Sequence, residues 1–244
     1  MSNLHQRFQK ACDQFVQKEQ QNPDIIGIIV AGSFVYGELA PNSDIDIFII
    51  LNPKCDFRER GNTWINGVEI EYFKNPPQQV LSYFEKEKNS PHTAHMIANG
   101  NVVYQNSPII DELRKQAETI LNTTPPKIKA IEIEFGKYFL DDMFKDLEDV
   151  MLKENAFAIH MIRDSVINKS IDLFCKKNQI QRMKNKRLEK QLTSINPQFV
   201  EVLKSITATD WKSNNSIQDL KIFMSKILGG ERSKEWVLKS ELDL

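Results

Sequence analysis

The chain has 244 residues, of which 41% are hydrophobic and 27% are charged, a balance typical of a globular protein. Its 32 basic and 33 acidic side chains leave a formal net charge of −1. This argues against a general nucleic-acid-binding protein, because such proteins usually carry a basic excess. The three cysteines, Cys12, Cys55 and Cys175, lie far apart. They indicate neither zinc nor a disulfide framework and favour a reducing, cytoplasmic compartment.

The N-terminal residues 1–21 are polar and interrupted by charge, so we expect no secretory signal. The longest apolar runs are far shorter than the roughly 20 residues that cross a bilayer. We therefore expect no membrane association.

Apolar spacing in the first half of the chain predicts helices mixed with strands. A helical period covers 4–20, and the continuous apolar run at 25–31 is typical of a buried strand. A second strand is expected at 44–51, where Asn52-Pro53 ends it. Asn66-Gly67 is a strong hairpin signal between strands at 63–65 and 68–73. The other predicted elements are a short helix at 33–39, a helix ending at 87, a helical segment at 94–98, a strand at 102–104 and a helix at 108–121.

Residues 122–126, Asn-Thr-Thr-Pro-Pro, form the best candidate linker. Beyond it, apolar residues fall three or four positions apart over 127–153 and 156–177, which predicts two long amphipathic helices. Shorter helices are expected at 186–193, 197–207 and 216–228. The predicted fold class is α/β (α+β), with a mixed sheet and flanking helices in domain 1–122 and a helical bundle in domain 127–244.

Two aspartates at the start of the second strand are the strongest chemical signal. Asp44 and Asp46 are one residue apart, so in a strand their side chains share a face. Two such carboxylates repel unless a cation lies between them, and oxygen-only ligands suit Mg2+ or Mn2+. Glu69 and Glu71 share a face of the later strand. We expect one of them to complete the site, with Glu69 preferred and Glu71 as the alternate.

Gly32-Ser33 follows the first strand, and ten residues, 34–43, separate it from Asp44. Glycine lets backbone approach a phosphate closely, and a helix N-terminus favours an anion. The Ser33 hydroxyl adds one hydrogen-bonding group. Taken alone, Gly-Ser after a strand is usually only a turn, and no Walker A or GxGxxG motif is present.

The combination of Gly-Ser, Asp-x-Asp and the later Val68-Glu69-Ile70 resembles the DNA-polymerase-β-like nucleotidyltransferase superfamily. The chain looks most like the antibiotic (aminoglycoside and lincosamide) nucleotidyltransferases and related bacterial proteins. The resemblance implies a nucleotidyltransferase catalytic domain at residues 1–122. It implies that Gly32 and Ser33 hold the triphosphate, and that Asp44, Asp46 and Glu69 are catalytic metal ligands.

The resemblance also implies roles for the C-terminal domain in binding nucleotide and substrate. Asp141 and Lys145 have the spacing of an acceptor-side acid and a nucleotide-binding lysine, although an i,i+4 pair on a helix is commonly surface decoration. Lys186 is the candidate for a lysine that reaches the triphosphate, and a solvated basic face explains it equally well. Tyr36 stands where relatives often have an arginine.

The function implied is transfer of a nucleoside monophosphate, with AMP favoured, from a nucleoside triphosphate such as ATP to a hydroxyl of a small molecule such as an aminoglycoside or lincosamide. Mg2+ or Mn2+ would be the cofactor. The alternatives are a protein or tRNA acceptor, or a non-catalytic nucleotide-binding module. A homodimer is compatible with the family. The sequence does not identify the acceptor, the base of the nucleotide or a role in antibiotic resistance.

Overall fold

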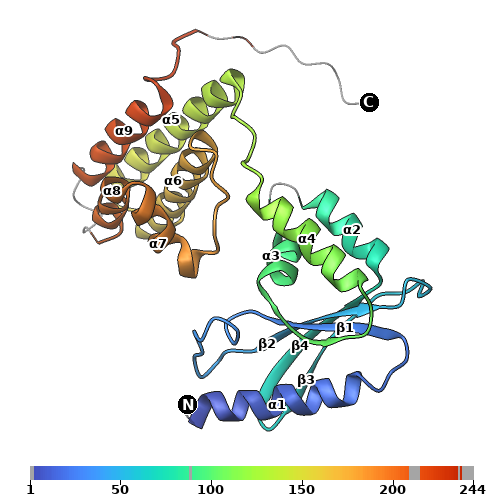
Figure 1. The fold of residues 1–244 in the computed structure, drawn as a ribbon. Helices are drawn as coiled ribbons and strands as arrows, with labels where there is room; N and C mark the ends of the chain where they lie inside the picture. The colour runs from blue at the N-terminus through green and yellow to red at the C-terminus, as the bar shows by residue number, and fades with distance from the viewer. Residues whose placement is uncertain (1–2, 88–89, 209–214, 236, 238–244) are drawn as a thin grey trace. The chain divides into compact units, whose positions relative to one another are not determined.

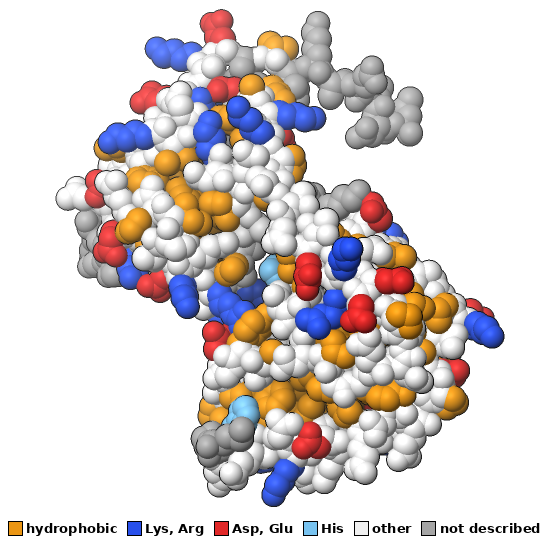
Figure 2. Space-filling model, in the orientation of Figure 1, with side chains coloured by type: hydrophobic (Ala, Val, Ile, Leu, Met, Phe, Trp, Pro, Cys, Tyr) orange, Lys and Arg blue, Asp and Glu red, His pale blue; other side chains and the backbone are white. Residues whose placement is uncertain are grey.

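The computed structural model describes residues 3–87, 90–208, 215–235 and 237. The chain divides into two compact units, Met1–Thr123 and Thr124–Leu244. The division falls inside the segment 122–126 that the sequence singled out as a linker. On the face shown in Figure 2, acidic and basic side chains are interspersed, in keeping with the near-zero net charge.

The first unit is built on a five-stranded sheet in the order β3-β4-β2-β1-β5. Neighbouring strands are antiparallel except for β2 and β4, which run parallel, so the sheet is mixed. The strands are β1 (Ile25–Ala31), β2 (Ile45–Leu51), β3 (Glu59–Ile65), β4 (Val68–Asn75) and β5 (Asn101–Gln105).

Helices cover both faces of this sheet (Figure 1). Helix α1 (Asn3–Glu19) lies on one face, where Phe8 and Phe15 pack against alternate residues of β2 such as Ile47. The other face holds α2 (Pro77–Lys86), α3 (His92–Asn99) and α4 (Ile109–Asn122). There Phe48 and Ile50 of β2 join the helices' apolar side chains. Since Asp46 has the same strand parity as Phe48 and Ile50, it lies on this second face.

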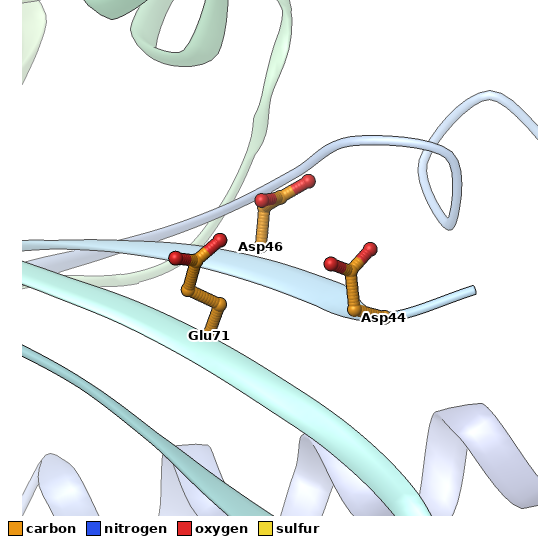
Figure 3. A group of neighbouring side chains, drawn as sticks. All are labelled: Asp44, Asp46 and Glu71. Atoms are coloured by element: carbon orange, nitrogen blue, oxygen red, sulfur yellow. The ribbon is translucent and has the colours of Figure 1, made fainter. Parts of the chain in front are cut away.

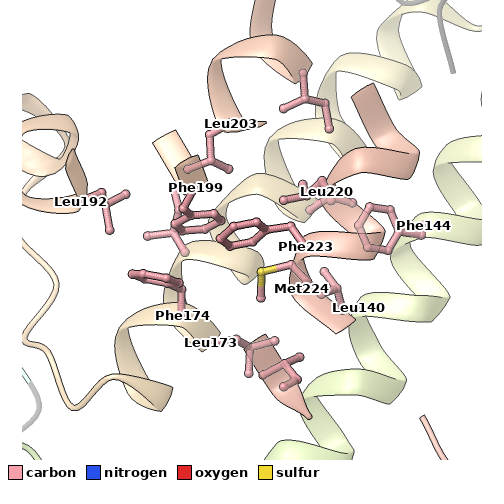
Figure 4. Close-up of a cluster of buried hydrophobic side chains, with 14 of the residues drawn as sticks. Leu140, Phe144, Leu173, Phe174, Leu192, Phe199, Leu203, Leu220, Phe223 and Met224 are labelled. Carbon is pink, nitrogen blue, oxygen red and sulfur yellow. The ribbon is translucent and has the colours of Figure 1, made fainter. Parts of the chain in front are cut away.

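The second unit is a helical bundle around one apolar core. Gly136 on the first of its helices lies so close to Leu173 that an added Cβ would come within 2.5 Å of the leucine side chain. Phe174, Phe199 and Phe223 form a continuous stack, with ring centroids 4.3 and 5.1 Å apart (Figure 4). The helices are α5 (Ala130–Leu152), α6 (Ala156–Lys177), α7 (Asn185–Ile195), α8 (Pro197–Ala208) and α9 (Asn215–Leu228).

The predicted fold class is confirmed, and one local prediction, the helix at 33–39, is wrong. Residues 33–37 form successive turns and residues 38–39 have no regular structure, so no helix forms here. Gly37 has a φ of 71°, which a right-handed helix does not accommodate. The strand expected at 63–65 begins earlier, at Glu59. Its first residues show no apolar alternation, and pairing with β4 decides their conformation.

Within the described residues, no helix has the length and apolar character needed to cross a membrane. Cytoplasmic localisation stays a prediction.

Replacing Phe199 with alanine is expected to destabilise the helical unit. Phe199 is fully buried at the centre of the aromatic stack, so the substitution should lower the free energy of unfolding by about 3–5 kcal/mol. Chemical denaturation followed by circular dichroism measures the change. Phe157→Ala is the matched control, because Phe157 is 77% exposed, and it should change stability by less than about 0.5 kcal/mol. Equal effects would contradict the assignment of the core.

The cysteines are expected to be unreactive in the native protein. Burial raises the pKa of Cys12 to about 12 and that of Cys175 to about 11, and it also raises the pKa of Cys55. The thiolate is the reactive species, so a thiol reagent at pH 7.5 should label the folded chain slowly. It should label all three cysteines promptly in denaturant. Rapid labelling of the folded chain would show that these side chains are not buried.

Candidate metal centre

Three carboxylates converge at the end of the sheet where β2 begins. Asp44, Asp46 and Glu71 each offer an oxygen, and these oxygens all lie within 4.8 Å of one another. Figure 3 shows the three side chains rising from the same face of neighbouring strands. All three are partly exposed. The set consists of hard oxygen donors only, and such donors fit Mg2+ or Mn2+.

The pairing of β2 with β4 accounts for the convergence. In the parallel register Asp46 lies directly opposite Glu71, so their side chains leave the same face of the sheet at adjacent positions. Asp44 precedes β2 and follows a turn in which Ser43 Oγ accepts a hydrogen bond of 2.9 Å from the Ala40 amide. Asp46 on β2 and Asp44 just before it therefore face Glu71 on β4.

Glu69, the glutamate preferred from the sequence, lies on the same face as Glu71 but outside this group. Its carboxylate accepts a 2.6 Å hydrogen bond from Asn62 Nδ2. The alternate, Glu71, is the glutamate that the geometry brings to the aspartates. The strand pattern alone could not separate the two, because the choice depends on the register that sets Ile45 opposite Ile70.

An open pocket of about 420 Å³ adjoins the carboxylates. Its lining comes from the start of β2 and from β3 and β4, and consists of Asp44, Arg60, Gly61, Asn62, Glu69 and Glu71. Neither Arg60 nor Asn62 was predicted from the sequence as a site residue. Arg60, Asn62 and Trp64 alternate along β3, so their side chains share one face of the sheet. Trp64 lies opposite Glu69 across the hairpin, and this alternation could have placed Arg60 and Asn62 on the face of the glutamates.

Gly32 packs directly against Asp46. A Cβ on Gly32 would lie 2.1 Å from Asp46 Oδ2, and the residue has a φ of +75°. Both the space and the backbone conformation therefore require glycine. Ser33 follows in a tight turn, where its carbonyl accepts a 3.0 Å hydrogen bond from the Glu38 amide. Because no helix begins at this turn, no helix dipole favours an anion here, contrary to the expectation from the sequence.

The remaining predicted site residues belong to the helical unit. Asp141 lies on α5, where it pairs with Lys145 at 2.8 Å and with Arg232 at 2.9 Å. Lys186 is exposed in the first turn of α7. The ion pair between Asp141 and Lys145 fits their interpretation as an i,i+4 pair on the helix surface. The roles of Asp141, Lys145 and Lys186 toward nucleotide or acceptor stay predictions.

Part of the N-terminal unit is similar to a known protein family. Residues 13–109 match the family described as "Polymerase beta, Nucleotidyltransferase", a segment that contains the whole sheet and the three carboxylates. The match supports placing this segment in the nucleotidyltransferase superfamily.

A nucleotidyltransferase-like protein from Exiguobacterium sibiricum has a related solved structure. It has a TM-score of 0.49 and 12% sequence identity, over 90% of this chain and 74% of that chain. A similarity at this level carries no argument about function. Comparison with curated proteins found no match.

Replacing Gly32 with alanine is expected to displace Asp46 and weaken metal binding. Gly37→Ala is the matched control, because Gly37 has a φ of +71° and nothing within 4 Å of an added Cβ. Both variants should lose about 1–2 kcal/mol of stability from backbone strain. Only Gly32→Ala should also weaken Mn2+ binding, by about tenfold or more, measured by titration calorimetry. Equal Mn2+ affinities in the two variants would contradict the contact's role.

Proposed function

We propose that this chain is a Mg2+- or Mn2+-dependent nucleotidyltransferase, which moves a nucleoside monophosphate from a nucleoside triphosphate to a hydroxyl and releases pyrophosphate. The observation that carries the proposal is the convergence of Asp44, Asp46 and Glu71 within the segment that matches the nucleotidyltransferase family. An acidic group alone would not suffice, because exposed carboxylates often gather without a function. The family match supplies the independent support.

The three carboxylates would hold the divalent cations. A bound cation supplies charge neutralisation for the triphosphate and lowers the pKa of the attacking hydroxyl. The chain's own contribution is to fix the ligands before substrate arrives. Gly32 sets the position of Asp46, and the strand register sets Glu71 opposite Asp46. Positioning and electrostatics of this kind account for most of the catalysis of phosphoryl-type transfers.

The Gly32-Ser33 turn is the proposed contact for the triphosphate. It lies against Asp46, so phosphates bound there would be next to the cations. Ser33 would contribute its hydroxyl and the turn its backbone amides, without the dipole of a helix. Lys145 and Lys186 are proposed as further nucleotide contacts and Asp141 as an acid on the acceptor side. ATP is the favoured nucleotide on the resemblance alone.

The proposed acceptor is a small hydroxyl compound, for which aminoglycosides and lincosamides are the first candidates. The pocket beside the metal centre is lined by three carboxylates, Asp44, Glu69 and Glu71, against one arginine. Its volume of about 420 Å³ lies within the roughly 300–1,000 Å³ of small-molecule sites. A tRNA acceptor is disfavoured because the chain, with a formal net charge of −1, lacks the basic excess usual in polynucleotide-binding proteins.

Asp46→Asn is expected to abolish magnesium-dependent pyrophosphate release while leaving the fold intact. The substitution keeps the size of the side chain and removes one ligand charge, so activity should fall at least about 100-fold. The assay is a pyrophosphate-release screen of aminoglycosides, lincosamides and tRNA with four nucleotides. Asp56→Asn is the control, because exposed Asp56 lies in the loop after β2, outside the acidic group.

Two outcomes would contradict the proposal. Asp46→Asn could retain wild-type pyrophosphate release at an unchanged melting temperature, which would remove the metal centre from the reaction. The wild-type chain could bind Mg2+ and ATP yet release no pyrophosphate with any acceptor class, which would favour a nucleotide-binding module.

A further inference from the structure

We infer that Arg60 is a positioning residue for the metal centre: it holds one oxygen of Glu71 from the side opposite the aspartates. The inference rests on the proposed function, because it presumes that Glu71 is a metal ligand. Neither the sequence pattern nor the family match assigns a role to this arginine.

Strand order places Arg60 and Asp46 on opposite sides of Glu71. The sheet runs β3-β4-β2, so β4, which carries Glu71, lies between the strand of Arg60 and the strand of Asp46. Asp46 is directly opposite Glu71 across the parallel pair. A cation held between Glu71 and the aspartates would therefore approach from the β2 side, whereas Arg60 approaches from the β3 side.

Two contacts hold the guanidinium in place. Arg60 Nη2 donates to Glu71 Oε1 at 2.6 Å, and this contact is also an ion pair. The guanidinium carbon lies 4.8 Å from the ring centroid of Phe73, the residue directly opposite Arg60 in the antiparallel register. The arginine thus covers the ring of Phe73 opposite it and reaches Glu71, two residues earlier on β4.

The contact engages only one of the two carboxylate oxygens. Arg60 is bonded to Oε1 through a single nitrogen, which leaves the geometry of Glu71 compatible with a cation at the other oxygen. Hydrogen-bonded partners that orient a ligating carboxylate commonly raise metal affinity 10- to 100-fold. Arg60 also offsets part of the repulsion within the acidic group.

Asn62 makes the corresponding contact with the other glutamate. It lies directly opposite Glu71 in the register, yet its amide donates to Glu69 Oε1 at 2.6 Å. Arg60 and Asn62 thus make the same kind of contact. Each bonds to the residue that lies two positions before its directly opposite partner on β4. Strand β3 thereby gives Glu71 a cationic partner and Glu69 a neutral one, which distinguishes two glutamates that are equivalent by strand pattern.

The contact with Arg60 is exposed, with 70% of the arginine side chain and 29% of the glutamate side chain accessible. Exposed ion pairs contribute little to stability. Replacing Arg60 should therefore leave the folded state intact and change mainly where the Glu71 carboxylate lies. This separates a positioning role from a purely structural one.

The test is a Mn2+ titration of the full chain by calorimetry or electron paramagnetic resonance, without nucleotide. Arg60→Ala should weaken Mn2+ binding by about tenfold, and Arg60→Lys should recover part of that loss because it restores the charge and one donor. Arg58→Ala is the matched control. It removes the same charge two residues earlier, where Arg58 donates to the Tyr83 hydroxyl at 2.8 Å, and it should change Mn2+ affinity less than twofold.

The outcomes separate this inference from the proposed function. If the wild-type chain binds no Mn2+, the metal centre and the role of Arg60 both fail. If the wild type binds Mn2+ and Arg60→Ala binds equally well, only the role of Arg60 fails. Tighter binding by Arg60→Ala would also overturn the inference, because it would mean that the arginine competes with the cation. Equal losses of Mn2+ affinity in Arg60→Ala and Arg58→Ala would mean that only the loss of one positive charge matters. That result would also overturn the inference.

Discussion

The parallel pairing of β2 with β4 is the constraint on which the site depends. It sets Asp46 opposite Glu71, and strand parity then places Asp44 and Asp46 on the face from which Glu71 also projects. A shift of one residue in this register would turn the glutamates to the α1 face, where Ile70 and Tyr72 now join the core. The apolar residues that alternate with the acids therefore protect the site: Ile45, Ile47 and Ile70 are fully buried, and burying a charged side chain in their place would be costly.

Residues on or next to the two neighbouring strands, β1 and β3, contact the acidic side chains of β2 and β4. Gly32, directly after β1, lies so close to Asp46 that an added Cβ would be 2.1 Å from Oδ2. From β3, Arg60 and Asn62 each take one of the two glutamates. The helices α2 to α4 cover the apolar part of the same face, through residues such as Phe48 and Ile50, and the end of β2 that carries the aspartates adjoins an open pocket. Apolar clusters on both faces of the sheet thus support a partly exposed acidic edge, the arrangement expected for pre-organised electrostatics.

Most of the fold was predictable from the sequence, because periodic apolar patterns are long and local. The helices at 130–152 and 156–177 follow from three- and four-residue steps. The strand at 25–31 follows from a continuous apolar run, and the strand at 45–51 from an apolar run interrupted by Asp46. The failures are positions where nonlocal or conformational effects decide. A helix was expected at 33–39, and the positive φ of Gly37 interrupts it. Strand β3 begins among polar residues, at Glu59, because β4 supplies its partner. The choice between Glu69 and Glu71 required a register, and the contributions of Arg60 and Asn62 required knowing that β3 is the neighbour of β4.

The most direct measurement of the central claim is a crystal structure of the chain soaked with Mn2+ and a non-hydrolysable ATP analogue, with the metal located by anomalous scattering. The account predicts an anomalous peak bound by Asp44, Asp46 and Glu71, with the triphosphate against Gly32-Ser33. A Mn2+ ion bound elsewhere, or bound by the aspartates with Glu69 in place of Glu71, would contradict it.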